Sequence, residues 1–202
     1  MFSPSEKRFL RSFNTADKIQ AYINGLVYNP TDHASSPRWV MMTGEGHCFE
    51  GGMIAAAALE LQGHKPLMVV LMAEDDDNHV LTVYKTATGW GSLSKSNTTL
   101  LAGRRPYYAS IRELVMSYFD FYFNMKGQLS LTAYSAPIDL NFYNHLEWRT
   151  TDNDLMEMGM NLCDHKNFEI IHPKKIKKLS KVHQKIQDAC FLGADPNGLY
   201  KA

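Results

Sequence analysis

Apolar residues recur at helical spacing in the first part of the chain. Residues 3–13 begin with Ser3 and Glu6, a capping-box pair, and continue with apolar residues on one face. Residues 15–28 repeat the helical spacing. We therefore expect two helices, followed by a surface loop at residues 29–39, which are rich in Pro, Ser, Asp and Asn.

A third helix is predicted for residues 48–62, with a different pattern. Apolar residues, including the alanines at 55–58, cover almost its whole circumference, and Gly63 follows as a C-cap. A helix that lacks a polar face is buried on most sides. We expect this helix to pack between a sheet and the surrounding helices.

Strands are predicted directly after this helix. Residues 66–73 form a short apolar run, typical of a central strand, and residues 79–85 are β-branched and alternating. The turn at 86–89 is typical of a hairpin, with residues 90–95 as the returning strand. Together with residues 129–135, these segments predict a central antiparallel sheet.

The remaining segments are expected to be mostly helical. Residues 111–127 predict a helix with core aromatic residues, residues 152–162 a further helix, and residues 167–173 a short extended piece. Residues 174–192 predict a basic helix with a solvated face, because they lack the interleaved aromatic residues that stack on nucleic-acid bases. The whole pattern predicts an α+β fold with additional helices at the C-terminus.

Length and composition are those of one globular domain. The 202 residues are 45% hydrophobic and 21% charged, with a formal net charge of zero. We expect a single domain over residues 1–202, with a core at about 15–135 and a helical extension at about 150–202. The charge balance provides no general basic field, so neither nucleic acid nor a membrane is expected as a partner.

The cysteines Cys48, Cys163 and Cys190 are widely spaced and form no CxxC pair. This spacing argues against a disulfide framework and against a zinc site, so no metal is expected. The N-terminal residues are charged where a signal peptide is apolar, and no apolar stretch is long enough to span a membrane. We expect a soluble protein of the reducing cytoplasm, with Cys163 and Cys190 as packing thiols.

Cys48 is the candidate for chemistry. It lies in the stretch GEGHCFEGG, at the first turn of the predicted buried helix, where backbone N–H groups and the helix dipole favour the thiolate. Gly51 and Gly52 leave room for a strand to approach the start of the helix. His79 opens a predicted strand after an acidic turn and is expected to be the general base.

This ordered set of motifs resembles the transglutaminase-like branch of the papain-like cysteine enzymes. The likeness covers residues 36–97: Gly-x-Cys at the start of a buried helix, then two strands, the second opening with a histidine, then a Trp. It implies a papain-like core with Cys48 as nucleophile and His79 as general base and acid. It also implies acyl transfer or amide hydrolysis through a thioester, without a metal or organic cofactor, on a peptide, protein or small amide substrate.

The third catalytic residue departs from the family pattern. Family members usually carry Asp or Asn a few residues beyond the Trp, and from Trp90 that position falls on Ser94. Regular alternation selects Ser94, whereas Asn97 has the better acceptor group and needs a bulge to reach the same face. Asp77 is a possible further support for His79. Because this strand carries no acid, the alternative function is an inactive transglutaminase-like fold that serves as a binding or scaffold module.

The resemblance also implies an oxyanion hole. Its donors would be the backbone N–H of Cys48 and a group from residues 38–42, with Trp39 the side chain selected by analogy. Glu50 is expected to complement the helix N-terminus, with contact to the substrate as its alternative role. His47 is expected to pack in the loop.

Overall fold

Four helices occupy the N-terminal part of the chain in the computed structural model, which describes residues 1–200. They are α1 (Pro4–Ser12), α2 (Ala16–Asn24), α3 (Pro37–Thr43) and α4 (Cys48–Glu60). The predicted capping box of Ser3 and Glu6 starts α1. Helix α3 lies where a loop was expected and begins with a proline at its first turn, a favoured position because the ring presets the helical φ angle.

The strands within residues 1–200 form one antiparallel sheet in the order β4-β3-β2-β1-β5-β7, with β6 beside β1. They are β1 (Leu67–Ala73), β2 (His79–Thr86), β3 (Gly89–Leu93), β4 (Arg104–Tyr108), β5 (Leu131–Ser135), β6 (Ile138–Asp139) and β7 (Asn167–Glu169). The predicted β2–β3 hairpin and the central position of β1 are confirmed. The α+β class, with a cysteine-bearing helix on an antiparallel sheet, is confirmed as well.

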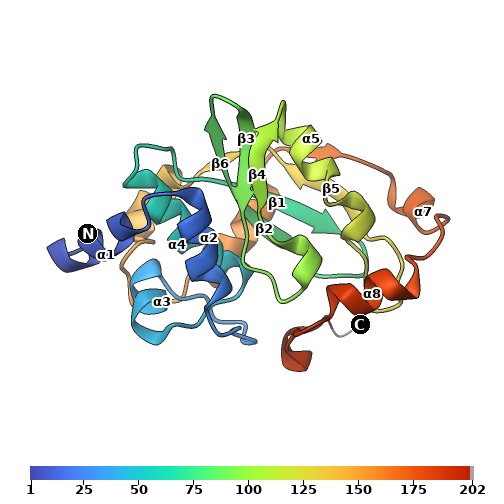
Figure 1. The fold of residues 1–202 in the computed structure, drawn as a ribbon, viewed down its shortest axis with the longest axis horizontal. Helices are drawn as coiled ribbons and strands as arrows, with labels where there is room; N and C mark the ends of the chain where they lie inside the picture. The colour runs from blue at the N-terminus through green and yellow to red at the C-terminus, as the bar shows by residue number, and fades with distance from the viewer. Residues whose placement is uncertain (201–202) are drawn as a thin grey trace.

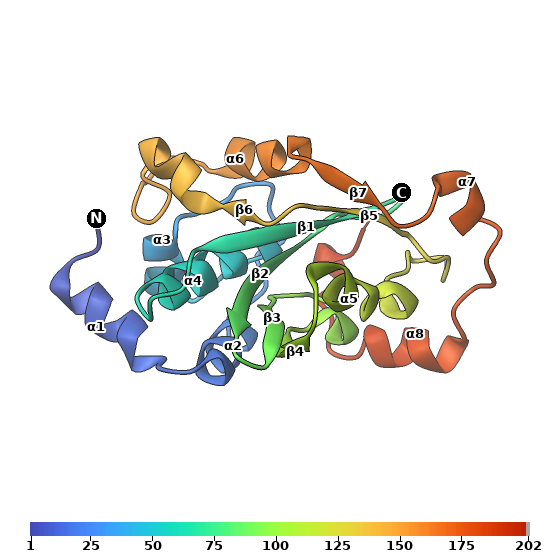
Figure 2. The same ribbon diagram turned by 90° about the horizontal axis from the view of Figure 1, so that it is seen from above.

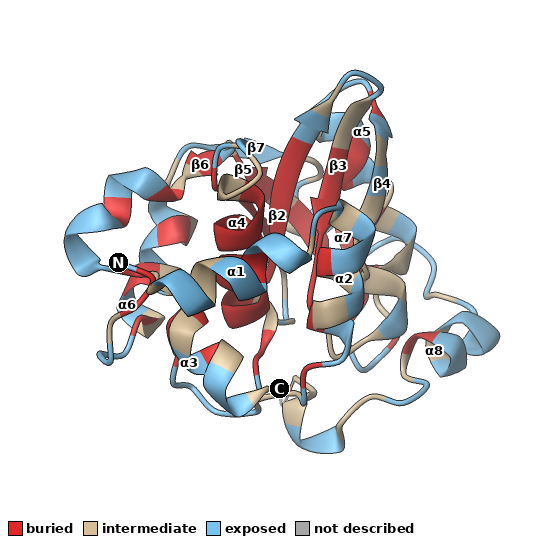
Figure 3. Ribbon diagram, turned by 60° about the vertical axis from the view of Figure 1, so that its left-hand side comes forward, coloured by how far each residue is buried: buried red, intermediate tan, exposed pale blue. Residues whose placement is uncertain are grey.

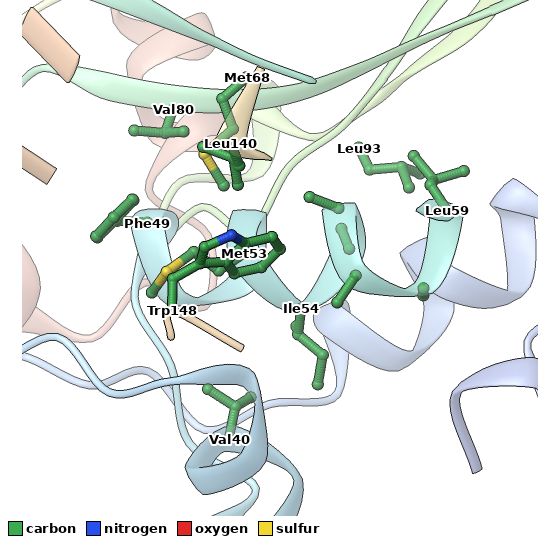
Figure 4. Close-up of a cluster of buried hydrophobic side chains, with 14 of the residues drawn as sticks. Val40, Phe49, Met53, Ile54, Leu59, Met68, Val80, Leu93, Leu140 and Trp148 are labelled. Atoms are coloured by element: carbon green, nitrogen blue, oxygen red, sulfur yellow. The ribbon is translucent and has the colours of Figure 1, made fainter. Parts of the chain in front are cut away.

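Helix α4 is buried along its length, as its pattern predicts. Every residue from Phe49 to Leu59 is buried, and Figure 3 shows α4 in red beside the red strands of the sheet. In Figure 4, Met68 and Val80 face α4 from the sheet, while Val40 of α3 lies on its other side. The alternate residues of β1 and β2 point to the opposite face of the sheet, where a second apolar cluster forms.

Helix α5 (Ile111–Met116) covers this second face and is shorter than predicted. The chain leaves the helix because Tyr118 and Tyr122 are buried and tied to other segments. The Tyr118 hydroxyl lies 2.7 Å from Ser92 Oγ, and the Tyr122 hydroxyl donates to Asp77 O at 2.6 Å. Tertiary packing thus overrides the helical pattern after Met116.

The C-terminal segment contains α6 (Met156–Asn161), α7 (Pro173–Ile176) and α8 (Gln184–Cys190). The single basic helix predicted for 174–192 is wrong, since α7 and α8 are separated by a stretch without helix. Lysines four residues apart along this stretch repel one another in a continuous helix. Lys177 instead contacts Glu74 at 2.8 Å and Asp75 at 2.9 Å.

Short 3-10 turns complete the described elements: η1 (Thr99–Leu101), η2 (Phe119–Phe121), η3 (Leu140–Leu146), η4 (Leu162–Asp164) and η5 (Pro196–Gly198). In Figures 1 and 2, α1 to α4 gather on one side of the central strands and α5 and α8 on the other. No helix within residues 1–200 has the length and apolar character needed to cross a membrane.

The buried core extends beyond the expected limits of 15–135. Phe2 and Leu10 belong to the cluster around α4, as does Trp148, which is fully buried. Strand β7 also joins the sheet from within the expected helical extension. The segments before and after the central motif therefore contribute buried side chains and a strand to the core.

Candidate functional site

Cys48 and His79 line one cavity of about 790 Å³. The cavity lies where the start of α4 meets the start of β2, and Tyr28 and Tyr122 contribute to its wall. Cys163 and Cys190 line the same cavity, and all three thiols are free. Their spacing in the sequence gave no sign that they would meet, because they come from three distant helical segments.

The start of α4 is fixed by reciprocal capping. His47 is the N-cap residue, and its Nδ1 accepts the Phe49 backbone N–H at 3.2 Å. The Glu50 carboxylate accepts the His47 backbone N–H at 2.9 Å. Cys48 follows as the first helical residue, so the two hydrogen bonds of this capping box set its position against the cavity.

Gly52 allows β1 and β2 to approach the first turn of α4 closely. A Cβ atom at Gly52 would lie 3.0 Å from Met68 Cε and 3.4 Å from Thr82 Oγ1, on β1 and β2. The Thr82 hydroxyl donates to the Gly52 carbonyl at 2.7 Å. The first turn of α4 is thereby held against β2, next to the strand end that carries His79.

Ser94 is the side chain that meets His79. Ser94 Oγ lies 2.6 Å from His79 Nε2 and 2.8 Å from the Leu101 carbonyl oxygen. A carbonyl oxygen only accepts, so the Ser94 proton points to Leu101 and Ser94 accepts from His79 Nε2–H. This chain of bonds assigns the proton to Nε2 and leaves Nδ1 of His79 as the basic nitrogen.

Burial keeps both members of the pair neutral. It raises the pKa of the Cys48 thiol to about 11, mainly by desolvation, although the backbone N–H of Val80 acts in the opposite direction. Burial likewise lowers the pKa of His79 to about 4, against a smaller opposing effect of the Leu101 carbonyl. The expected thiolate is therefore wrong for this state, because desolvation outweighs the favourable position at the helix start.

No hydrogen bond joins the Cys48 sulfur to the His79 ring within residues 1–200, although both line the cavity. The sulfur lies close to the backbone N–H of Val80, the residue that follows His79. Catalytic contacts are often long in a free enzyme and shorten in the complex with substrate. The cavity is thus lined by a neutral Cys48 thiol and a neutral His79 imidazole.

Asn97 does not contact His79, which corrects the second candidate for the third residue. Its Nδ2 donates to the Asp195 carbonyl at 2.8 Å, and its Oδ1 accepts the Asp195 N–H at 2.8 Å. Both polar atoms are therefore used by the C-terminal segment. Asp77 does not reach His79 either, and its charge instead raises the pKa of Cys48 slightly further.

Neither Trp39, the expected oxyanion donor, nor Glu50, whose alternative role was substrate contact, lines the cavity. The Trp39 indole N–H donates to Asp152 Oδ1 at 3.0 Å, and the residue is 38% exposed on α3. Glu50 is buried and accepts the Ser35 backbone N–H at 2.7 Å and Asn29 Nδ2 at 3.0 Å. Its carboxylate thus ties the loop before α3 to the first turn of α4.

Tyr28 also lies on the cavity wall. The sequence pattern does not indicate it as a site residue, because it ends the second predicted helix. Two other donors on the wall are engaged: Asn29 Nδ2 binds Glu50, and Asn78 Nδ2 lies 3.6 Å from Cys163 Sγ. The Tyr28 hydroxyl has no hydrogen-bond partner within residues 1–200. Its pKa is raised, mainly by burial and next by the Cys48 charge, so the phenol stays protonated.

The charged residues of the cavity wall are acidic. Asp32, Asp76 and Asp77 line it, and within residues 1–200 no Lys or Arg does. Burial, followed by the charge of Asp32, raises the pKa of Asp77. The two carboxylates are close enough to interact, which gives this part of the cavity wall a negative potential.

No group of three His, Cys, Asp or Glu side chains suited to a metal ion occurs within residues 1–200. Neither a known protein-family model nor a curated protein matches the chain.

Proposed function

We propose that this protein is a papain-like, transglutaminase-like cysteine enzyme that transfers acyl groups or hydrolyses amides through Cys48. The observation that carries the proposal is the hydrogen-bond chain from His79 Nε2 through Ser94 Oγ to the Leu101 carbonyl, on the cavity that Cys48 lines. This chain presents the basic Nδ1 for proton transfer. A histidine oriented in this way is the second member of a nucleophile–base pair.

Because the resting pair is neutral, proton transfer accompanies attack. His79 Nδ1 takes the Cys48 proton as the sulfur adds to the substrate carbonyl carbon, which forms the C–S bond and a tetrahedral oxyanion. The His79 imidazolium then returns the proton to the leaving amine as the C–N bond breaks, and a thioester remains. Water or an amine adds to the thioester with His79 as base, and the Cys48 thiol leaves.

Two donors are assigned to the oxyanion. One is the backbone N–H of Cys48 at the start of α4, and the other is the hydroxyl of Tyr28 on the cavity wall. The Asp32 and Asp77 carboxylates favour neutral or cationic substrates over anionic ones. The free thiols suit a reducing compartment such as the cytoplasm.

The test is acylation of Cys48 by p-nitrophenyl acetate, followed by release of p-nitrophenol and by peptide mass spectrometry. Cys48→Ala and His79→Ala are expected to abolish acylation, whereas Cys163→Ala, which removes another thiol of the same cavity, leaves it intact. Loss of an oxyanion donor slows acyl transfer by roughly 100- to 1000-fold, so Tyr28→Phe should slow acylation but not alkylation by iodoacetamide. Alkylation has no oxyanion to stabilise.

The second candidate is a binding or scaffold module with this fold and without turnover. The lack of a carboxylate at the end of the His79–Ser94–Leu101 chain favours it, because a carbonyl stabilises imidazolium less than an acid does. In that case wild-type Cys48 is not acylated by p-nitrophenyl acetate, and this result would reject the enzyme.

A further inference from the structure

We propose that residues 191–200, here called the C-terminal strap, form a detachable gate that restricts access to Cys48, with Asn97 as its clamp. This inference concerns regulation and rests on the proposed function of the same cavity. Figure 1 shows the end of the described chain in dark red, turning back from α8 toward the middle of the molecule.

The strap forms one wall of the Cys48 cavity. Phe191 and every residue from Asn197 to Tyr200 line it, together with Cys48 and His79. The remaining wall comes from the body of the domain, including the loop at 28–32 and residues 76–80. Outward movement of the strap therefore opens the cavity along this side and leaves the body in place.

The strap is weakly attached for a segment in this position. Cys190, at its root, is 3% exposed, but no residue from Phe191 to Tyr200 is buried. A cavity of about 620 Å³ lies between strap residues 192–196 and the body of the domain. Segments with little buried apolar surface open at low free-energy cost, without global unfolding.

Asn97 makes the main polar attachment. Its side-chain amide both donates to and accepts from the backbone of Asp195, with both distances 2.8 Å. Thr99 Oγ1 adds a bond to the Leu192 carbonyl at 3.0 Å. These bonds contact only backbone atoms of the strap. Asn97 lies three positions after Ser94, so the clamp is close in sequence to the His79–Ser94–Leu101 hydrogen-bond chain.

Gly198 makes a second, apolar attachment. It lies against the ring of Tyr28, so close that a Cβ atom at this position would overlap the ring carbons. Tyr28 is itself on the cavity wall. The strap therefore touches the site at a position where an added methyl group cannot fit while the strap is closed, and Gly198→Ala is a second way to release it.

The test measures iodoacetamide labelling of Cys48 by peptide mass spectrometry, which reports access whether or not the thiol turns over. Asn97→Ala removes two hydrogen bonds of ordinary strength, which corresponds to an increase of about 5- to 100-fold in the open population. Both Asn97→Ala and Gly198→Ala should accelerate labelling by up to this factor, with little change in the thermal midpoint.

Two variants serve as matched controls. Asn153→Ala changes an exposed asparagine outside the Cys48 cavity, and Gly25→Ala adds a methyl group where its nearest atom, the Tyr22 carbonyl oxygen, lies 3.4 Å away. Both should label at the wild-type rate. The gate is rejected if Asn97→Ala and Gly198→Ala also label at that rate, or if the controls accelerate equally. Failure of acylation by p-nitrophenyl acetate in all variants rejects the proposed function and leaves the labelling result intact.

Discussion

Ser94 Oγ, directly after β3, lies 2.6 Å from Nε2 of His79 at the start of β2, and the position of Ser94 rather than its chemistry brings them together. The β2–β3 register pairs Val83 with Ser92, and alternation places Ser94 on the face of Ser92. Asn97 has the stronger acceptor, but it lies beyond the strand and binds Asp195. A weaker hydrogen-bonding group therefore occupies the position of the proposed third catalytic residue.

Replacement of Ser94 by alanine tests this relationship. Ser94→Ala leaves the imidazole without its fixed partner, so acylation should slow by at least roughly tenfold. The upper limit is the full contribution of a general base, roughly 100- to 10,000-fold. Ser92→Ala is the matched control, since Ser92 is equally buried on the same face and contacts Tyr118 instead. Equal acylation rates in wild type and Ser94→Ala would mean that the site is a Cys–His dyad.

The pH dependence of Cys48 labelling follows from its environment. The pKa of Cys48 is raised to about 11, so the thiolate fraction and the alkylation rate should climb by about tenfold per pH unit across pH 8 to 10. A plateau near pH 8 would contradict this burial. Denatured protein provides the comparison, because its solvated thiols reach their plateau at lower pH.

His79 makes the free energy of unfolding depend on pH. Its pKa is lowered from 6.5 to about 4 in the folded state, so the unfolded chain binds the extra proton between these values. The contribution of His79 is fully present above pH 6.5 and is lost as pH falls toward 4, by roughly 3 kcal/mol in total. Urea unfolding of His79→Gln should show a flatter dependence in this window, whereas His145→Gln, at an exposed site, should follow wild type.

Glu50 is predicted to support the fold rather than contact substrate. Its carboxylate accepts the His47 and Ser35 backbone N–H groups and the Asn29 amide, so Glu50→Gln puts an amide donor where only acceptors fit. The expected cost is about 1–3 kcal/mol in the free energy of unfolding, measured in urea. Glu157→Gln, at an exposed position on α6, should change stability little.

The alanine run of α4 is predicted to tolerate no larger side chain. Ala57 is 1% exposed in the core cluster, so Ala57→Leu should overpack it and cost about 1–3 kcal/mol. Ala21→Leu makes the same change on the exposed face of α2 and should leave the melting temperature nearly unchanged. Equal melting temperatures for wild type and Ala57→Leu would contradict the packing of α4.

The sequence by itself determined those features that follow from local periodicity. The unbroken apolar surface of residues 48–62 predicted a buried helix, and alternation predicted the β2–β3 hairpin. The same alternation favoured Ser94 over Asn97, since side chains two residues apart share one face of a strand. Each of these predictions depends on neighbours in the chain.

Only the tertiary structure decided features that depend on distant segments. The position of Trp39 beside Asp152, the use of Asn97 by Asp195 and the meeting of three thiols in one cavity all join parts far apart in the sequence. The protonation of Cys48 is the sharpest case, since the helix start favours a thiolate while burial raises its pKa. Local sequence gives the dipole, but desolvation is the sum of everything that packs around the sulfur, and only the folded chain supplies it.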